Sequence, residues 1–296
     1  MSDGIAVVVV THRSEDTVDA CLSRLRTADG VEAMAVVDNA SDDGTLAAVQ
    51  RHAVADARLR FVGNPDNPGF ATGCNQGVEA LRARGCTAPW LAFVNPDCLV
   101  APDSLARLRD AAVRLGGNAL VGADLVDARG LRDGAARRRD PDFGRMVAGA
   151  LRGGGEARLD VPVDEAATLQ VVDAASGALM LLPRALFDAI GGFDAHYRLH
   201  AEDLDLCRRV RGAGGIVAVA NDVRVVHVRG VSSRSRPVFV EWHKHRGLWR
   251  YFRKFEAPRR GWPMRAAVFV ATWLRFPVAA WRAWRGARPG VSAGAA

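Results

Sequence analysis

An α/β fold is predicted for this 296-residue chain, and two features of its first third predict it. Short apolar runs typical of buried strands alternate with segments of helical spacing. Polar residues follow directly where the apolar runs end, which is typical of the ligand-binding edge of an open parallel sheet. A charged fraction of 25% and a hydrophobic fraction of 49% are ordinary for a globular protein of this length.

The predicted strands of the first half cover residues 5–11, 34–37, 58–62 and 90–94. Apolar residues at helical spacing predict helices over residues 14–26, through Leu46 and Val49, and through Val78 and Leu81. Ser14 or Asp16 is the expected cap of the first helix. Before the third helix, Pro68 and Gly69 suit the two central positions of a type II turn.

The second half begins with residues 127–163, which are rich in Gly and Arg and which we interpret as loops and short helices. A strand follows at 178–182 and a helix at 184–190, with Gly191 and Gly192 as its stop. The last predicted elements are a helix that begins at the acidic stretch HAEDLDLCRR, residues 200–209, and short strands at 216–220 and 223–228.

The five cysteines are scattered and form no C-x-x-C pair. We therefore expect reduced, buried thiols in a cytoplasmic protein, not a disulfide framework or a zinc site. The first residues, MSDGIAVVVVTHR, contain an apolar run that is too short for a membrane span and follows an acid. They predict a buried strand, not a signal peptide.

The net charge of +7 belongs mainly to the C-terminal segment, residues 236–296, which also holds six of the seven tryptophans. Arginine suits lipid phosphates and tryptophan suits the membrane interface. Since the longest uncharged apolar run there, residues 266–274, is too short to cross a bilayer, we expect the segment to lie on an anionic membrane surface. The alternatives are a helical pair packed on the catalytic domain or on a second subunit, and nucleic-acid binding, for which no known module is recognisable.

Polar side chains at the strand ends form a second group of candidates. Asp38 and Asn39 follow the second strand, and Asn95 and Asp97 follow the fourth, while His227 lies in the last strand. Taken singly, they are explained by an Asx turn, a helix cap and a core histidine. Taken together, they fall on the side of the sheet where a phosphate-bearing ligand and a Mg²⁺ or Mn²⁺ ion would bind, with Asp97 and His227 as ligands.

The acidic stretch offers a third group. Asp205 is explained by pairing with Arg208 or Arg209 one helical turn later. Glu202 and Asp203 are either helix caps or catalytic groups. The chain contains no G-x-x-x-x-G-K phosphate loop and no G-x-G-x-x-G fingerprint after a strand, so ATP-driven and NAD-dependent chemistry are disfavoured.

Seven motifs in order carry a family resemblance: VVVVTHRS, VVDNASDDGT, NPGFATGCNQG, FVNPDC, SGALMLLPRALFDAIGGFD, AEDLDLCRR and VVHVRGVS. Across residues 5–235 the chain resembles family 2 glycosyltransferases, and most of all the rhamnosyltransferase-like members that build bacterial cell-surface polysaccharides. The resemblance implies a GT-A fold, with a nucleotide-sugar-binding half at 1–125, an acceptor-binding half at 126–235 and a helical extension at 236–296.

The resemblance also implies roles for particular residues. The implied nucleotide-sugar contacts are Thr11, Arg13, Asp38, Asn67, Gly69, Asn75, Asn95 and Asp97. The implied metal ligands are Asp97 and His227, with Asn95 in place of one carboxylate of the usual Asp-x-Asp motif, so that weaker metal affinity is expected. Asp203 is the implied catalytic base, with a pKa raised by its neighbour, and Glu202 orients the acceptor or holds a helix-start amide. His200 stands where relatives often carry an aromatic residue.

The activity implied is an inverting, metal-dependent transfer from dTDP-rhamnose, or of a hexose from a UDP-sugar, to a lipid-linked or polysaccharide acceptor at the inner face of the cell membrane. Two alternatives come from other classes. A sugar-phosphate nucleotidyltransferase would need a Gly-rich, Lys-bearing first loop, which Thr11, His12 and Arg13 do not provide. A catalytically silent nucleotide-binding membrane partner is supported only by Asn95.

Overall fold

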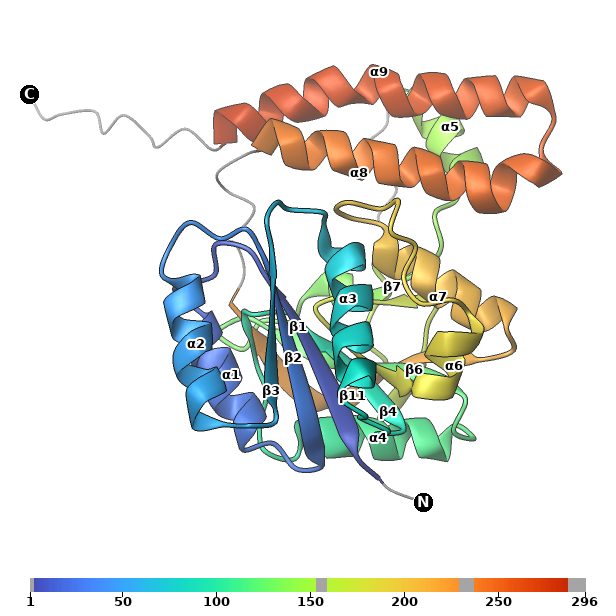
Figure 1. Cartoon of the computed structure of the whole chain (residues 1–296). Coiled ribbons are helices and arrows are strands. Elements are labelled where there is room, and N and C mark those ends of the chain that lie inside the picture. The colour runs from blue at the N-terminus through green and yellow to red at the C-terminus, as the bar shows by residue number, and fades with distance from the viewer. Residues whose placement is uncertain (1–2, 153–158, 229–236, 287–296) are drawn as a thin grey trace, which may run out of the picture. The chain divides into compact units, whose positions relative to one another are not determined.

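The computed structural model describes residues 3–152, 159–228 and 237–286, which fall into two compact units (Figure 1). The described part of the first unit comprises residues 3–141, 159–198 and 202–228. That of the second comprises residues 142–152, 199–201 and 237–286.

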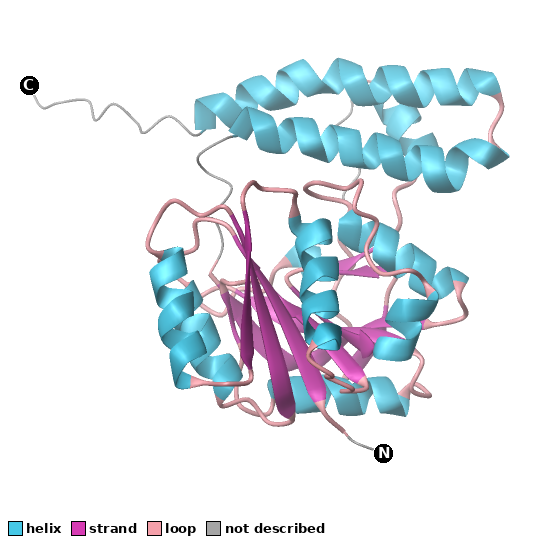
Figure 2. Ribbon diagram, viewed as in Figure 1, coloured by secondary structure: helices cyan, strands magenta, loops and turns pink. Residues whose placement is uncertain are grey.

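A mixed sheet forms the centre of the first unit (Figure 2). Within the described residues, its nine strands are β1 (Ile5–Thr11), β2 (Val31–Asn39), β3 (Leu59–Asn64), β4 (Trp90–Val94), β5 (Cys98–Leu99), β6 (Ala119–Val126), β8 (Leu169–Val171), β10 (Leu179–Pro183) and β11 (Ile216–His227). Their order is β3-β2-β1-β4-β10-β6-β11-β5, and β8 pairs with β11 beside it. The strands from β3 to β4 are parallel, so their carboxyl ends meet at one edge.

Shorter elements and helices complete the first unit. β7 (Arg137–Arg138) and β9 (Ala174–Ala175) form a small antiparallel sheet that the turn η1 (Gly134–Ala136) precedes. The helices are α1 (Val18–Arg26), α2 (Thr45–Ala55), α3 (Phe70–Ala83), α4 (Ser104–Arg114), α6 (Arg184–Ala189) and α7 (Glu202–Gly212). The predicted alternation of strands and helices is therefore confirmed.

β1 is buried on both faces, as its continuous apolar run predicts. Ile5, Val7 and Val9 join the core built with α1 and α4. Val8 and Val10 face α3 on the other side, where Gly77 and Gly73 allow close packing. A methyl group on Gly77 would approach a methyl of Val8 to 2.4 Å, so an alanine there would force the helix away from the sheet.

Three details of the elements differ from the sequence-based expectation. α1 begins at Val18, because the Ser14 N–H donates to Thr45 Oγ1 at 2.7 Å and its carbonyl is used in a turn; no side chain caps the helix. The two short late strands are one strand, β11, with an irregular register between Ala220 and Arg224. The region 127–163 holds the expected short helices, η1 and α5 (Phe143–Leu151), and also the strand β7, which was not expected.

Gly69 corrects the predicted type II turn. Its φ of 101° is positive, as expected, but its ψ is 167°, whereas a type II turn needs a value near zero. The physical reason is a close approach between two segments of the chain, since a Cβ on Gly69 would lie 2.4 Å from the carbonyl oxygen of Arg198. Gly191 and Gly192, with φ of 76° and 69°, end α6 as predicted.

The second unit is helical, with α5 (Phe143–Leu151), α8 (Pro237–Tyr251) and α9 (Trp262–Gly286). A π-helical turn (Phe252–Glu256) and the short η3 (Ala257–Arg259) join the last two helices. Aromatic rings link them: Trp242 and Trp273 lie 4.9 Å apart, and Phe143 and Phe252 are also 4.9 Å apart, between ring centroids. Among the described helices, none combines the length and the apolar character needed to cross a membrane.

Candidate active site

The ends of β1 and β2 bring Thr11 and Asp38 together, since the two residues are partners in the strand register. Thr11 Oγ1 donates to Asp38 Oδ1 at 2.7 Å, and the Ser41 hydroxyl donates to the same oxygen at 2.6 Å. The Ser41 N–H donates to Asp38 Oδ2 at 2.9 Å, so the carboxylate also holds the backbone three residues further on. Both side chains are buried and fixed, and their contact with a nucleotide stays a prediction.

Arg13 and Asn67 shape the loops beside this edge. Arg13, at a φ of 51°, donates through Nε and Nη2 to the two carboxylate oxygens of Asp42 at 2.6 and 2.5 Å. The Asn67 side-chain oxygen accepts from the Gly69 N–H at 3.0 Å, which fixes the start of α3. In the structure both residues hydrogen bond within these loops and so fix the loop conformation. Their direct contact with the donor stays a prediction.

Asn75 joins two distant parts of the first unit. Its amide donates to the Phe193 carbonyl at 2.8 Å and accepts from the Phe193 N–H at 2.9 Å, a pairing across 118 residues. Gly192 makes room for it, since a Cβ there would lie 2.8 Å from the Asn75 side-chain oxygen. The observed role of Asn75 is to hold the loop after α6 against α3.

The predicted metal ligands Asp97 and His227 lie together at the junction of β5 and β11. His227 Nε2 is 3.3 Å from Asp97 Oδ1, and the Cys98 thiol completes a group whose ligand atoms lie within 4.8 Å of one another. His227 is paired with Cys98 in the strand register, and the Val228 N–H donates to the Asp97 carbonyl at 2.9 Å. Backbone pairing therefore sets the separation of the two side chains.

The donor set fits a hard divalent cation. Donor atoms about 2.1 Å from an ion and at right angles are about 3.0 Å apart, close to the spacing of these Asp97 and His227 atoms. His227 Nδ1 is buried without a hydrogen-bond partner among the described residues, and it lies 3.9 Å from Asp133 Oδ2. Cys98 is a poorer candidate, because burial and the Asp97 charge raise its pKa well above the ordinary value and its thiol donates to the Ala178 carbonyl.

Glu202 and Asp203 begin α7, and both are buried. Asp203 Oδ2 accepts from Arg138 Nη2 at 2.5 Å and from the Gly177 N–H at 3.0 Å, while Oδ1 accepts from the Leu204 N–H at 2.8 Å. Glu202 Oε2 is buried without a hydrogen-bond partner among the described residues. The two neighbours thus have opposite environments, one charge-paired and one not.

These environments move the two pKa values apart. Burial, and then the charge of Asp203, raise the pKa of Glu202 to about 8. Burial also acts to raise the pKa of Asp203, but the charge and hydrogen bond of Arg138 outweigh it, so the pKa is lowered. The expectation that like-charge repulsion raises the pKa of the base is corrected: the rise falls on Glu202, because the cation stands beside Asp203.

Gly177 and Ala178 connect the acidic pair with the metal-ligand candidates. The Gly177 N–H donates to Asp203, and the Ala178 carbonyl accepts from the Asn95 N–H at 2.8 Å and from the Cys98 thiol at 3.3 Å. A methyl group on Gly177 would lie 3.3 Å from the Asp203 Cβ, so a glycine lets α7 approach. Gly177 and Ala178 therefore place the acidic pair and the metal-ligand candidates in one region of the first unit.

The third acid of the stretch has the structural role that its spacing predicts. Asp205 is fully buried and accepts from Arg209 Nε at 2.5 Å. Arg209 also donates to the carbonyls of Ile190 and Gly192. The other candidate partner, Arg208, donates instead to Asp140 at 2.5 Å.

Sequence reasoning missed Arg138 and Gly177, although both contact Asp203. Arg138 lies in a run of three arginines, residues 137–139, inside a region that lacks clear periodicity. These consecutive arginines lie in the sequence between two predicted carboxylate sites. That position is the sequence signal that could have indicated an ion pair with one of the carboxylates.

Comparison with known proteins finds similarity to glycosyltransferases. Residues 6–149 match the family described as Glycosyl transferase family 2, and residues 158–241 match Glycosyl transferase family 21. The N-acetylglucosaminyl-diphospho-decaprenol L-rhamnosyltransferase of Mycobacterium tuberculosis is 27% identical over 310 residues, covering 93% of this chain and 93% of that one. Rhamnosyltransferase WbbL of Escherichia coli is 24% identical over 234 residues, covering 78% of this chain and 86% of that one.

Solved structures resemble the whole chain. The mannosyltransferase PcManGT from Pyrobaculum calidifontis, in complex with GDP-Man and Mn²⁺, aligns with a TM-score of 0.56 at 21% identity, covering 99% of this chain and 76% of that one. The likeness confirms the predicted fold class, a GT-A α/β domain with a helical C-terminal region.

Proposed function

We propose that this chain, whose residues 6–149 match glycosyltransferase family 2, transfers rhamnose from dTDP-rhamnose, with inversion, to a lipid-linked acceptor of cell-surface glycan synthesis. A rhamnosyltransferase that aligns over nearly its whole length supports this choice, and the name of that relative gives N-acetylglucosaminyl-diphospho-decaprenol as its acceptor. A hexose from a UDP-sugar is the second donor to test. The match to glycosyltransferases disfavours the nucleotidyltransferase alternative.

The observation that carries the proposal is the bridge at Gly177 and Ala178, which holds Asp203 on one side and the Asn95 to Cys98 turn on the other. An inverting transfer needs a base at the attacking hydroxyl and charge stabilisation at the departing diphosphate on the opposite face of the sugar. The bridge supports the assignment of Asp203 as the base and of Asp97 with His227 as the charge-stabilising pair.

In the proposed reaction, Asp203 accepts the proton of the acceptor hydroxyl as that oxygen attacks the anomeric carbon. Its lowered pKa leaves it ionised at neutral pH, whereas Glu202, with a pKa of about 8, is mostly protonated there. Glu202 would instead orient the acceptor, with its protonated carboxyl group as a hydrogen-bond donor. Asp97 and His227 would hold a Mg²⁺ or Mn²⁺ ion, which neutralises charge on the diphosphate when bound.

The proposal places the second unit at an anionic membrane surface. On α9, Val270, Leu274, Val278 and Trp281 follow a spacing of four, four and three residues and are between 49% and 72% exposed. Such spacing puts them on one face of the helix, and exposed arginines occur along the same helix. An apolar stripe with arginines is typical of a helix that lies in the lipid interface, where a lipid-linked acceptor is found.

The first test is binding of dTDP, UDP and GDP by calorimetry with and without Mn²⁺, followed by transfer from the sugar nucleotide of the preferred base to an N-acetylglucosaminyl-diphospho lipid. We expect metal-dependent binding with a preference for dTDP, and an inverted anomeric configuration in the product by NMR. Nucleotide binding with the same affinity in the presence and absence of Mn²⁺ would contradict the metal assignment. A product with the donor's anomeric configuration would contradict the inverting mechanism.

A second test concerns the membrane. Sedimentation with vesicles that contain phosphatidylglycerol should capture the protein, and Leu274→Asp should reduce capture at least about tenfold, since a charge in the apolar stripe opposes burial in lipid. Val54→Asp is the matched control, because Val54 is 90% exposed on α2 in the first unit. Equal capture of both variants would exclude the α9 stripe as the contact.

A further inference from the structure

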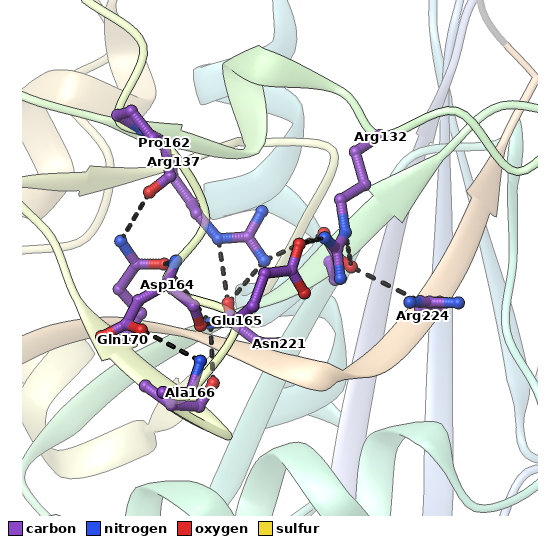
Figure 3. A network of polar contacts seen from close by, with 11 residues as sticks. Arg132, Arg137, Pro162, Asp164, Glu165, Ala166, Gln170, Asn221 and Arg224 are labelled. Carbon is purple, nitrogen blue, oxygen red and sulfur yellow. Dashed lines mark hydrogen bonds and ion pairs between the residues drawn. The ribbon is translucent and has the colours of Figure 1, made fainter.

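Arg137 and Arg138 are neighbours on β7, and a strand directs neighbouring side chains to opposite faces. Arg137 is 1% exposed, lies 2.9 Å from Asp124 Oδ1 through Nη2, and donates from Nε to Asn221 Oδ1 at 2.9 Å (Figure 3). Arg138 donates to Asp203 instead. The buried network around Arg137 therefore fixes β7, and the alternation of the strand directs Arg138 to the acidic pair.

The Arg138 guanidinium is held in place by a second contact. Its Nη2 also donates to the Ala175 carbonyl on β9, at 2.9 Å, and β9 is the strand paired with β7. The Arg138 and Asp203 side chains are 15% and 13% exposed, so water screens their attraction little. The ion pair is thus short, fixed to a strand pair and largely buried.

The hydrogen bonds of Asp203 indicate which oxygen remains available. A carboxylate accepts about four hydrogen bonds, two at each oxygen. Oδ2 takes two, from Arg138 and Gly177, and Oδ1 takes one, from Leu204. The remaining acceptor position is on Oδ1, so this oxygen can accept the proton of an acceptor hydroxyl.

We propose that Arg138 is a positioning residue of the transfer reaction: it holds Oδ2 of Asp203, leaves Oδ1 for the acceptor hydroxyl, and confines the one proton of the acidic pair to Glu202. The inference rests on the proposed role of Asp203 as the base. It adds a residue that acts on the reaction through Asp203 without contact to the substrate.

The groups around the pair support this division of charge. Arg138 on β7 is the cation that faces Asp203, and Glu202 and Cys207 on α7 and Cys74 on α3 are the other titratable neighbours. Burial, together with the charges of these carboxylates, raises the pKa of both thiols, which leaves them neutral. Without Arg138, two adjacent buried carboxylates would compete for one proton, and Asp203 would hold it part of the time.

The test compares Arg138→Met and Arg138→Lys with wild type in the pH dependence of kcat/KM, whose acid limb reports the base of the free enzyme. We expect the limb to move upward by at least about one pH unit in Arg138→Met, a tenfold change in proton affinity. Arg138→Lys should move it less, because the ammonium keeps the charge but loses the planar fork. Nucleotide affinity should stay unchanged in both variants.

Arg208→Met is the matched control, since it removes an arginine to aspartate bond of 2.5 Å on α7 that does not involve Asp203. Carboxyl ¹³C NMR of the donor-free protein gives a readout without turnover, with the Asp203 signal identified by its loss in Asp203→Asn. If the pKa of Asp203 is the same in wild type and both Arg138 variants, the inference about Arg138 is wrong, while the assignment of Asp203 as the base is unaffected. Retained transfer in Asp203→Asn would overturn the base assignment itself.

Discussion

Two polar regions of the first unit differ in how completely their side chains are hydrogen bonded. In the donor edge, defined here as Thr11, Asp38 and Asn75, each side chain has protein partners at 2.6–2.9 Å. The reaction cluster, defined as Asp97, His227, Glu202 and Asp203, contains buried atoms without partners at His227 Nδ1 and Glu202 Oε2 among the described residues.

We interpret the difference as a distinction between residues that shape the site and residues that act on a ligand. A buried polar atom without a partner costs about 1–3 kcal/mol, and a fold retains such atoms where a ligand or a chemical step uses them. Side chains that are hydrogen bonded to the protein fix the shape of the donor edge in the absence of a ligand. We therefore expect changes in the reaction cluster to alter chemistry, and changes in the donor edge to alter stability.

The largest expected effect is that of Asp203→Asn. Transfer should fall roughly 10²- to 10⁴-fold in kcat, because an amide cannot accept the proton, while the Kd for the nucleotide stays unchanged. Rapid-quench assays and calorimetry measure the two quantities. Asp140→Asn is the control, as Asp140 also accepts from arginines of α7, at 2.5–2.8 Å, but does not contact Asp203. If Asp203→Asn is as active as the control, Asp203 is not the catalytic base.

Asp97→Ala and His227→Ala should each remove a metal ligand. The gain in nucleotide affinity on adding Mn²⁺ should drop by at least about tenfold in each, as measured by calorimetry across a Mn²⁺ series. Cys98→Ser should keep the full gain, because the buried thiol is protonated and the hydroxyl can also donate to Ala178. A loss in Cys98→Ser that matches the other two variants would make the thiol a ligand after all.

Asn75→Ala tests the donor edge. It leaves the Phe193 N–H and carbonyl without their partner, so the free energy of unfolding should fall by about 1–3 kcal/mol in urea denaturation. Nucleotide affinity should change less. Gln76→Ala, next on α3, should have a smaller effect on stability, since its partner Asn64 keeps a bond to Asn39. A large loss of affinity with unchanged stability would make Asn75 a direct donor contact.

Glu202→Gln should change how stability depends on pH. The folded protein keeps the Glu202 proton up to about pH 8, whereas the unfolded chain loses it near 4.5. Raising the pH between these values therefore lowers the wild-type free energy of unfolding, by up to about 1.4 kcal/mol per pH unit from this group. The glutamine variant lacks this contribution and should gain relative to wild type as the pH rises. Parallel pH profiles of the two proteins would show that Glu202 ionises normally.

Much of the fold was predictable because strands and helices of the first half follow local patterns. The strand at 5–11 and the strand at 90–94 have the predicted bounds, and glycines end α6 as expected. The conformation of Gly69 was not predictable, because it depends on the backbone of Arg198, far along the chain. The single strand β11 was missed because Asn221 interrupts the pattern to anchor other loops.

The sequence by itself determined the fold class, the order of the elements and the identity of the motif residues, since side-chain periodicity and turn chemistry are properties of neighbouring residues. Only the tertiary structure decided which of Glu202 and Asp203 holds the proton. In the structure Asp203 is hydrogen bonded to Arg138, which lies 65 residues away in the chain. Electrostatic effects depend on distance and burial in space, so a cation brought beside one carboxylate distinguishes two acids that the sequence leaves equivalent.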